Sequence, residues 1–201
     1  MKTKKKDTPR DLREECVQQA LAIIADGGID TLSLRDVARR LGVSHQAPYK
    51  HFPSREHILA EVLRRAYSDF ATYLEARMRG HAPDEALRHL GLAYLAYARN
   101  NPLHYQLMFA TPLPDPDEHP EMMDEARRAF GMLRGALAAL PHRGDENLNR
   151  DALFVWSTMH GLASIMKTRL GHQMGLTDAA IPQTSRHVLD MIGRALGNAG
   201  E

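Results

Sequence analysis

The stretch 31-TLSLRDVARRLGVSHQAPYKHF-52 decides the fold of the N-terminal part of the chain. Ser33 is a typical N-cap, because its side-chain oxygen can accept a backbone N–H of the first helical turn. Apolar residues then recur at the spacing of one helical face: Leu34, Val37, Ala38 and Leu41. Gly42 follows, where the end of a helix favours a left-handed residue. The pattern predicts a short helix that ends at Gly42.

A second short helix is expected directly after this turn. Ser44 is another N-cap, and the predicted helix runs from His45 to about Phe52. Two short helices joined by a tight turn that contains glycine are typical of a helix-turn-helix, whose second helix lies in the major groove of DNA. The alternative is an ordinary helical hairpin whose polar residues face water.

Polar side chains of the second helix have the chemistry to contact DNA. Gln46 can pair with adenine, Lys50 can donate to guanine or to a phosphate, and Tyr49 offers a hydroxyl to a phosphate. The predicted DNA-binding residues are Ser33, Arg35, Ser44, His45, Gln46, Ala47, Tyr49, Lys50, His51 and Arg55.

The motif around this turn resembles the N-terminal domain of the tetracycline-repressor (TetR) family of transcriptional regulators. The resemblance covers about residues 10–63 and rests on Ala38, Leu41, Gly42, Val43 and Ser44, then Tyr49, His51 and Phe52, then Arg55 and Leu59. It implies an all-helical protein in which the helix after Ser54 links the DNA-binding domain to the rest. Pro48 departs from the family pattern, which has leucine or isoleucine in the core there. Proline lacks a backbone N–H, so we expect an irregular start to the recognition helix.

Composition and charge are those of a globular protein with a basic front. The chain has 201 residues, of which 43% are hydrophobic and 25% charged. Residues 1–65 hold 13 basic and nine acidic side chains, a net charge of +4, whereas residues 66–201 have a net charge of −3. This asymmetry fits a DNA-binding domain attached to a second domain.

Several classes of protein are disfavoured by the sequence. Cys16 is the single cysteine, so neither an intramolecular disulfide nor a cysteine-rich zinc site is expected, and we interpret it as a core residue. We see no apolar run of transmembrane length and no secretory signal, and we expect a cytoplasmic protein. We expect no catalytic residues, metal or cofactor, because paired metal-ligand motifs and phosphate-binding loops are missing.

The chain is predicted to form a basic arm (1–9), a helix-turn-helix domain (10–63) and a helical domain (64–201). The arm holds Lys2, Lys4, Lys5 and Lys6, which either contact DNA or form a solvated tail. About nine helices and no strands are expected. Besides those named above they span 10–26, 54–74, 83–100, 103–110, 121–140, 147–170 and 183–196. The proline-rich stretch 111–120 is predicted to be a loop.

The second domain is expected to bind a small apolar or aromatic ligand, as the resemblance to TetR regulators implies. Trp156, His160 and Gly161 resemble a W-x-x-x-H-G motif found in one C-terminal subclass of the family. The candidate pocket residues are aromatic or flexible and apolar: Tyr94, Tyr97, Tyr105, Met108, Phe109, Phe130, Leu133, Trp156, Met159 and His160. The alternative for each is an ordinary core position, and His160 could either anchor a ligand or bind a carbonyl inside the core.

The last two helices are the predicted surface of a homodimer that reads a palindromic operator. The residues on which this rests are Leu153, Val155, Ser157, Leu162, Ser164 and Ile165, followed by Val188, Leu189, Met191, Ile192, Ala195 and Leu196. The function expected from the sequence is therefore a ligand-responsive regulator, and more specifically a repressor. The alternatives are a ligand-independent architectural DNA-binding protein and, least favoured, an all-helical enzyme.

Overall fold

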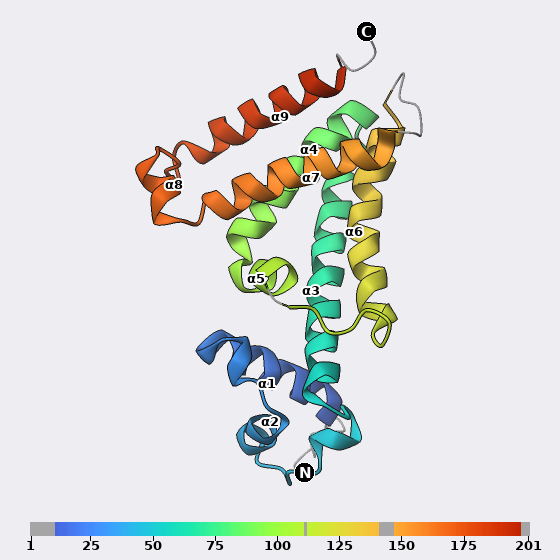
Figure 1. Cartoon of the computed structure of the whole chain (residues 1–201), viewed down its shortest axis with the longest axis vertical. Helices are drawn as coiled ribbons and strands as arrows, with labels where there is room; N and C mark the ends of the chain where they lie inside the picture. The colour runs from blue at the N-terminus through green and yellow to red at the C-terminus, as the bar shows by residue number, and fades with distance from the viewer. Residues whose placement is uncertain (1–10, 111, 141–146, 198–201) are drawn as a thin grey trace, which may run out of the picture. The chain divides into compact units, whose positions relative to one another are not determined.

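The computed structural model describes residues 11–110, 112–140 and 147–197, and these form nine α-helices, two short 3-10 helices and no strand (Figure 1). The predicted all-helical fold is confirmed, whereas the basic arm lies outside the described residues. The helices are α1 (Leu12–Gly27), η1 (Ile29–Thr31), α2 (Leu34–Leu41), η2 (Pro48–Lys50), α3 (Arg55–Met78), α4 (Pro83–Asn100), α5 (Pro102–Ala110), α6 (Pro120–Ala138), α7 (Leu148–Ile165), α8 (Arg169–Gln173) and α9 (Ile181–Gly197).

These helices form two compact units. Unit 1 contains the described residues up to Leu63 together with the segment 112–122, and unit 2 contains residues 64–110 and the described residues from Met123 onward. Helix α3 begins in unit 1 and continues into unit 2, since the division falls after Leu63.

The core of unit 1 consists of apolar side chains from α1, α2 and the start of α3. Cys16 is fully buried on α1, as expected for a small core residue. Val37 and Ala38 of α2 and Ile58 of α3 are equally inaccessible to solvent. Packing of these short helices into one core, rather than helix propensity, therefore stabilises unit 1.

The recognition segment is less helical than the sequence predicted, because a helix with an irregular start was expected over His45–Phe52. Residues 45–47 form turns, and only Pro48–Lys50 is helical, in the tighter 3-10 form. The N–H groups of Ala47, Lys50 and His51 each donate to the carbonyl three residues earlier. Pro48 has no N–H for a bond to Ser44, and its ring is buried in the core of the unit, as its position predicted.

A segment distant in sequence completes unit 1. Residues 112–119 are non-helical, as the prolines predicted, and α6 begins at Pro120, a residue suited to the first helical position. The His119 ring is buried and lies edge-on to His57 of α3, with ring centroids 4.9 Å apart. No pattern in the sequence indicated this contact.

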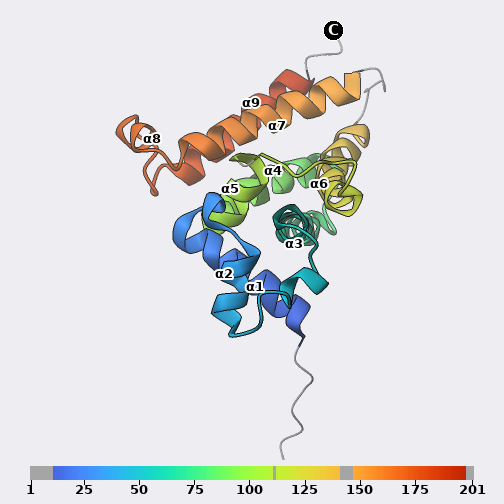
Figure 2. The same cartoon turned by 60° about the horizontal axis from the view of Figure 1, so that its bottom comes forward.

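Helix α4 is central to unit 2, because it contacts α5, α7 and α9. Gly91 allows the α4–α9 contact, since a Cβ atom at this position would collide with the side chain of Leu189. Helices α7 and α9 lie alongside each other in opposite directions, with α8 at the bend between them (Figures 1 and 2).

Helix α7 ends earlier than expected, because the predicted helix 147–170 is broken after Ile165. Thr168 caps the new helix α8 by accepting the N–H of Gly171 at 2.9 Å. Gly171 is buried against the carbonyl of Ile165, where a side chain would not fit. The break is therefore specified by a cap and a glycine rather than by proline. Within the described part of the chain, every helix is too short or too polar to cross a membrane.

Candidate nucleic-acid interface and ligand site

The helix-turn-helix is built by two caps that the sequence predicted. The Ser33 side chain accepts the N–H of Asp36 at 3.1 Å and thereby begins α2. Gly42 ends α2 in the left-handed conformation, with φ of 66°. The N–H of Val43 then donates to the carbonyl of Ala38, which fixes the turn that leads into the recognition segment.

The recognition segment exposes the side chains with DNA-binding chemistry. Ser44, His45, Gln46, Tyr49, Lys50 and His51 are all exposed, whereas Ala47 is half-buried and Pro48 is buried. One short segment therefore presents a hydroxyl, an amide, a phenol, two imidazoles and an ammonium group to solvent. Hydrogen-bonding groups of this variety can contact both base edges and phosphates.

The predicted arginines have different surroundings. Arg35 is exposed on α2 and forms no ion pair with any described residue. Arg55 is occupied within unit 1, because it donates to the carbonyls of Leu32 at 3.0 Å and Ile29 at 2.7 Å. Arg55 therefore ties α3 to the segment before α2, and a contact with DNA remains a prediction for this residue.

Most of the predicted ligand-site residues come together in an aromatic cluster in unit 2. The cluster comprises Phe70, Tyr94, Tyr105, Phe109, Phe130, Trp156 and His160. Phe109 is its centre: its ring lies 4.8 Å from Tyr105, 5.1 Å from His160 and 6.2 Å from Trp156. Contributions come from α3, α4, α5, α6 and α7, so the cluster joins the helices of the unit.

The remaining predicted pocket residues line the core around this cluster. Tyr97 contacts Phe70, with ring centroids 4.9 Å apart. Met108, Leu133 and Met159 are buried. These four residues pack in the core of the unit, and a role in a ligand pocket remains a prediction for each of them.

A hydrogen-bonded triangle lies within the aromatic cluster. The hydroxyls of Tyr94 and Tyr105 are 3.0 Å apart, and they lie 3.2 Å and 2.7 Å from Nδ1 of His160. Burial raises the pKa of both tyrosine hydroxyls, so they remain protonated donors. Burial lowers the pKa of His160, so its imidazole is neutral near pH 7. The triangle is thus a neutral polar centre inside an aromatic environment.

Two hollows lie beside this centre. The first measures about 380 Å³ and is lined by residues of α7: Leu153, Phe154, Trp156, Ser157 and His160. The second measures about 520 Å³ and is lined by residues between α7 and α8 and on α8: Met166, Lys167, Thr168, Arg169, His172 and Gln173. Lys167 connects the second hollow to the cluster, since its Nζ lies 4.3 Å from the centre of the Tyr105 ring.

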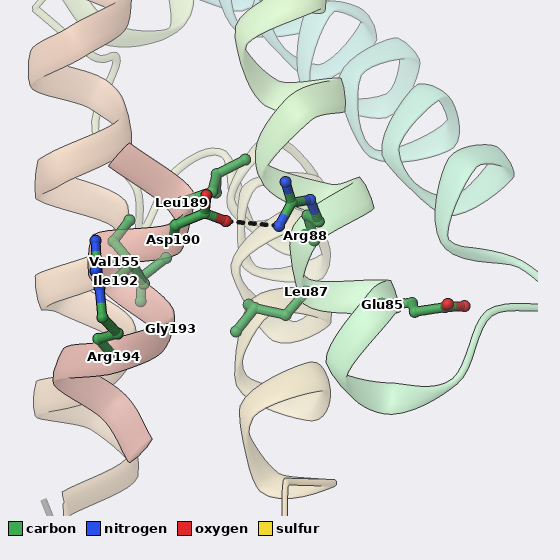
Figure 3. A pocket seen from close by; sticks show the side chains of 9 residues that line it. All are labelled: Glu85, Leu87, Arg88, Val155, Leu189, Asp190, Ile192, Gly193 and Arg194. Carbon is green, nitrogen blue, oxygen red and sulfur yellow. Dashed lines mark hydrogen bonds and ion pairs between the residues drawn. The ribbon is translucent and has the colours of Figure 1, made fainter. Parts of the chain in front are cut away.

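A third hollow, of about 640 Å³, lies where α4 meets α7 and α9 (Figure 3). Its floor is apolar and includes Leu87, Leu189 and Ile192. Arg88 and Asp190 form an ion pair of 2.7 Å across its rim. Its lining holds two acidic side chains, Glu85 and Asp190, and two basic ones, Arg88 and Arg194, so this hollow has no net charge with which to attract a ligand.

Sequence reasoning missed two members of the site. Phe70 lies on the long apolar face of α3, which was interpreted as core. Lys167 was placed inside a continuous helix, where nothing indicated a contact with Tyr105. His81 and His89 stack with their ring centroids 3.7 Å apart, and the described residues include no group of three potential metal ligands.

Comparisons with known proteins agree with this architecture. Residues 17–62 match the family of bacterial regulatory proteins named after tetR, and residues 87–192 match the tetracyclin repressor-like C-terminal domain. An uncharacterized HTH-type transcriptional regulator of Mycobacterium tuberculosis is 30% identical over 156 residues, which are 78% of this chain and 70% of that protein.

Two solved structures show the same fold. A protein of unknown function from Rhodococcus sp. RHA1 is 23% identical and has a TM-score of 0.75 over 96% of this chain and 98% of that one. The regulator FadR from Bacillus subtilis, solved with stearoyl-CoA, is 14% identical and has a TM-score of 0.66 over 94% of this chain and 98% of that one.

The fold and the exposed recognition segment define a DNA-binding transcriptional regulator of the helix-turn-helix class. With both of its parts matched, the chain belongs to the TetR family of bacterial regulators.

Proposed function

We propose that this protein is a homodimeric repressor that binds a palindromic operator and releases it when a small molecule binds in unit 2. The observation that carries the proposal is the pairing of an exposed recognition segment with a polar triangle inside an aromatic cluster. A purely architectural DNA-binding protein would have no need for such a centre. Acting on bacterial DNA, the protein would function in the cytoplasm.

The proposed dimer surface is narrower than the sequence indicated. Val155, Leu189, Ile192 and Leu196 are buried within one chain and are unavailable to a partner. Leu153 and Ile165 on α7 and Met191 on α9 remain about half exposed, at 51%, 50% and 51%. Exposed apolar groups on two adjacent helices fit the four-helix dimer interfaces formed by helix pairs of two copies.

The proposed ligand site is the aromatic cluster with its adjoining hollow on α7. Trp156 and His160 are one turn apart, in keeping with the motif noted in the sequence, and both line this hollow. A ligand there would contact α5 and α7 together, and it would favour a conformer with a different spacing of the recognition segments. Since linkage is reciprocal, operator DNA should weaken ligand binding by the same factor.

Operator binding tests the first half of the proposal. Operator fragments selected from genomic DNA should bind the wild-type protein, and Lys50→Ala should weaken this binding at every salt concentration. If Lys50 contacts a phosphate, the salt dependence should fall by about one unit of slope. Lys50→Ala should leave the dimer intact in analytical ultracentrifugation, and unchanged operator affinity would exclude the assigned role.

The variant Trp156→Phe tests the second half of the proposal, which is that a small molecule bound in unit 2 releases the operator. This variant retains an aromatic ring but lacks the indole N–H, so operator affinity should stay unchanged while the response to an inducing compound weakens. A normal response in a folded variant would mean that the ligand binds elsewhere.

A further inference from the structure

We infer that the effector is an amphiphilic anion, whose apolar body lies against the aromatic cluster and whose anionic head group lies in the basic hollow beside α8. This inference rests on the proposed function, because it assigns a ligand class to the same site.

Polarity changes steadily along one face of α7. Trp156, His160 and Ser164 follow one another at helical spacing, and Lys167 continues the series in the turn after the helix. The series passes from an indole through a neutral imidazole and a hydroxyl to a cation. A ligand that lies along this face would meet apolar surface at one end and positive charge at the other.

The charged end is a hollow with an excess of positive charge. Two of its six lining residues, Lys167 and Arg169, are cations, a third is His172, and none is acidic. Neither cation forms an ion pair with a residue in the described ranges. This distinguishes the hollow beside α8 from the third hollow at α4, α7 and α9, where Arg88 is already paired with Asp190.

Lys167 lies between the site proposed for the ligand's head group and the site proposed for its apolar body, because it lines the hollow and also contacts Tyr105. Lys167 is exposed overall, but its ammonium group lies over the Tyr105 ring, and the partial desolvation there lowers its pKa. An ammonium group that has lost part of its hydration is stabilised by a nearby anion. A carboxylate, sulfonate or phosphate in the hollow would supply that anion, and the ligand's apolar part would lie in the hollow on α7, beside Trp156.

His160 contributes a hydrogen-bond donor between the two ends. The Tyr105 hydroxyl lies 2.7 Å from Nδ1, and we assign the phenol as donor in this bond, which puts the proton of the neutral imidazole on Nε2. Nε2 therefore donates to an oxygen of the ligand, which favours an ester, amide or ether group between body and head. This arrangement disfavours cationic ligands at both polar positions.

Two fluorescent probes with nearly the same aromatic body test the inference. Anilinonaphthalene sulfonate carries an anion, whereas phenylnaphthylamine is neutral. The double variant Lys167→Gln/Arg169→Gln should lose about tenfold in affinity for the sulfonate, equivalent to about 1.4 kcal/mol, and keep its affinity for the neutral probe. Lys167→Arg/Arg169→Lys should restore sulfonate binding.

The matched control removes two positive charges elsewhere in unit 2. Arg79 lies directly after α3 and Arg127 lies on α6, and both are exposed. The variant Arg79→Gln/Arg127→Gln should therefore bind both probes like the wild type. An unchanged sulfonate affinity in the Lys167/Arg169 variant would overturn the inference. So would an equal loss for both probes, or an equal loss in the control, since either result would reflect folding or net charge.

Operator release separates this inference from the proposed function. Sulfonate binding that depends on Lys167 and Arg169 supports the ligand class even if the protein keeps its operator. In that case the regulatory proposal fails, and what stands is that this site binds an amphiphilic anion. Release of the operator by the neutral probe alone would overturn the inference and leave the regulatory proposal intact.

Discussion

Arg55 shows how one side chain can belong to a DNA-binding motif and still serve the fold. Its two hydrogen bonds to the carbonyls of Leu32 and Ile29 hold the start of α3 against the segment before α2. Arg55→Ala should lower the free energy of unfolding by about 2 kcal/mol, because charged hydrogen bonds to two partly buried carbonyls are lost. Urea denaturation measures this change.

Arg35→Ala is the matched control for Arg55→Ala. Since Arg35 is exposed, its removal should change the stability by at most about 0.5 kcal/mol while weakening operator binding. If Arg55→Ala were as stable as the wild type, the two hydrogen bonds from Arg55 to the carbonyls would contribute nothing measurable to the free energy of unfolding.

His160 makes stability depend on pH in a direction that can be worked out. Burial lowers its pKa in the folded protein below the ordinary value of 6.5, so the unfolded chain binds its proton more readily. Its contribution to stability is therefore full above about pH 6.5 and is lost as the pH falls through the folded pKa. Unfolding free energies measured from about pH 8 to about pH 5 should decline more steeply for the wild type than for His160→Gln. Parallel curves would contradict this, since the other histidines are common to both proteins.

The sequence predicted several members of the aromatic cluster but not how they are arranged. Aromatic character in the second domain indicated Tyr94, Tyr105, Phe109, Phe130 and Trp156, and all five lie in the cluster. Phe70 could not be assigned from sequence, because periodicity identifies a buried face without identifying its partners.

The contact of helix α4 with helix α9 depends on the absence of a side chain at Gly91. Gly91→Ala should destabilise the protein by about 1–3 kcal/mol, because the new methyl group would collide with Leu189 and force the helices apart. Thermal unfolding monitored by circular dichroism measures the effect.

Gly131→Ala on α6 is the control, since a Cβ there meets no atom within 4 Å. In this helical position alanine should raise the stability by up to about 1 kcal/mol. Equal effects of the two substitutions would show that α4 and α9 can separate at little cost.

Local sequence patterns predicted where most helices lie, but they did not predict helix breaks that depend on tertiary contacts. Pro83 at the start and Pro102 after the end predicted α4 at residues 83–100, and the structure has Pro83–Asn100. The break before α8 depends on Gly171 packing on the Ile165 carbonyl, a contact that exists only after folding. The 3-10 form of the recognition segment was foreseen only as an irregularity at Pro48.

The exposed apolar residues on α7 and α9 form the surface through which we propose that two copies of the whole molecule associate. Leu153→Asp/Met191→Asp should yield a folded monomer, because both side chains are half exposed in one chain and a buried carboxylate would prevent association. Analytical ultracentrifugation gives the mass, and operator affinity should fall at least about a hundredfold as one half-site is lost.

Leu170→Asp is the control for the dimer variant. This side chain is 62% exposed on α8, outside the proposed surface, so the variant should remain dimeric. A dimeric Leu153→Asp/Met191→Asp protein would place the interface elsewhere.

The contact between His57 and His119 sets a limit on how separable the DNA-reading part of this protein is. A chimaera that exchanges residues up to 63 with a relative would leave the 112–122 segment behind, although that segment belongs to the same unit. Modular shuffling of such regulators must therefore transplant two stretches of sequence, or select a new residue at 119 to suit the foreign partner.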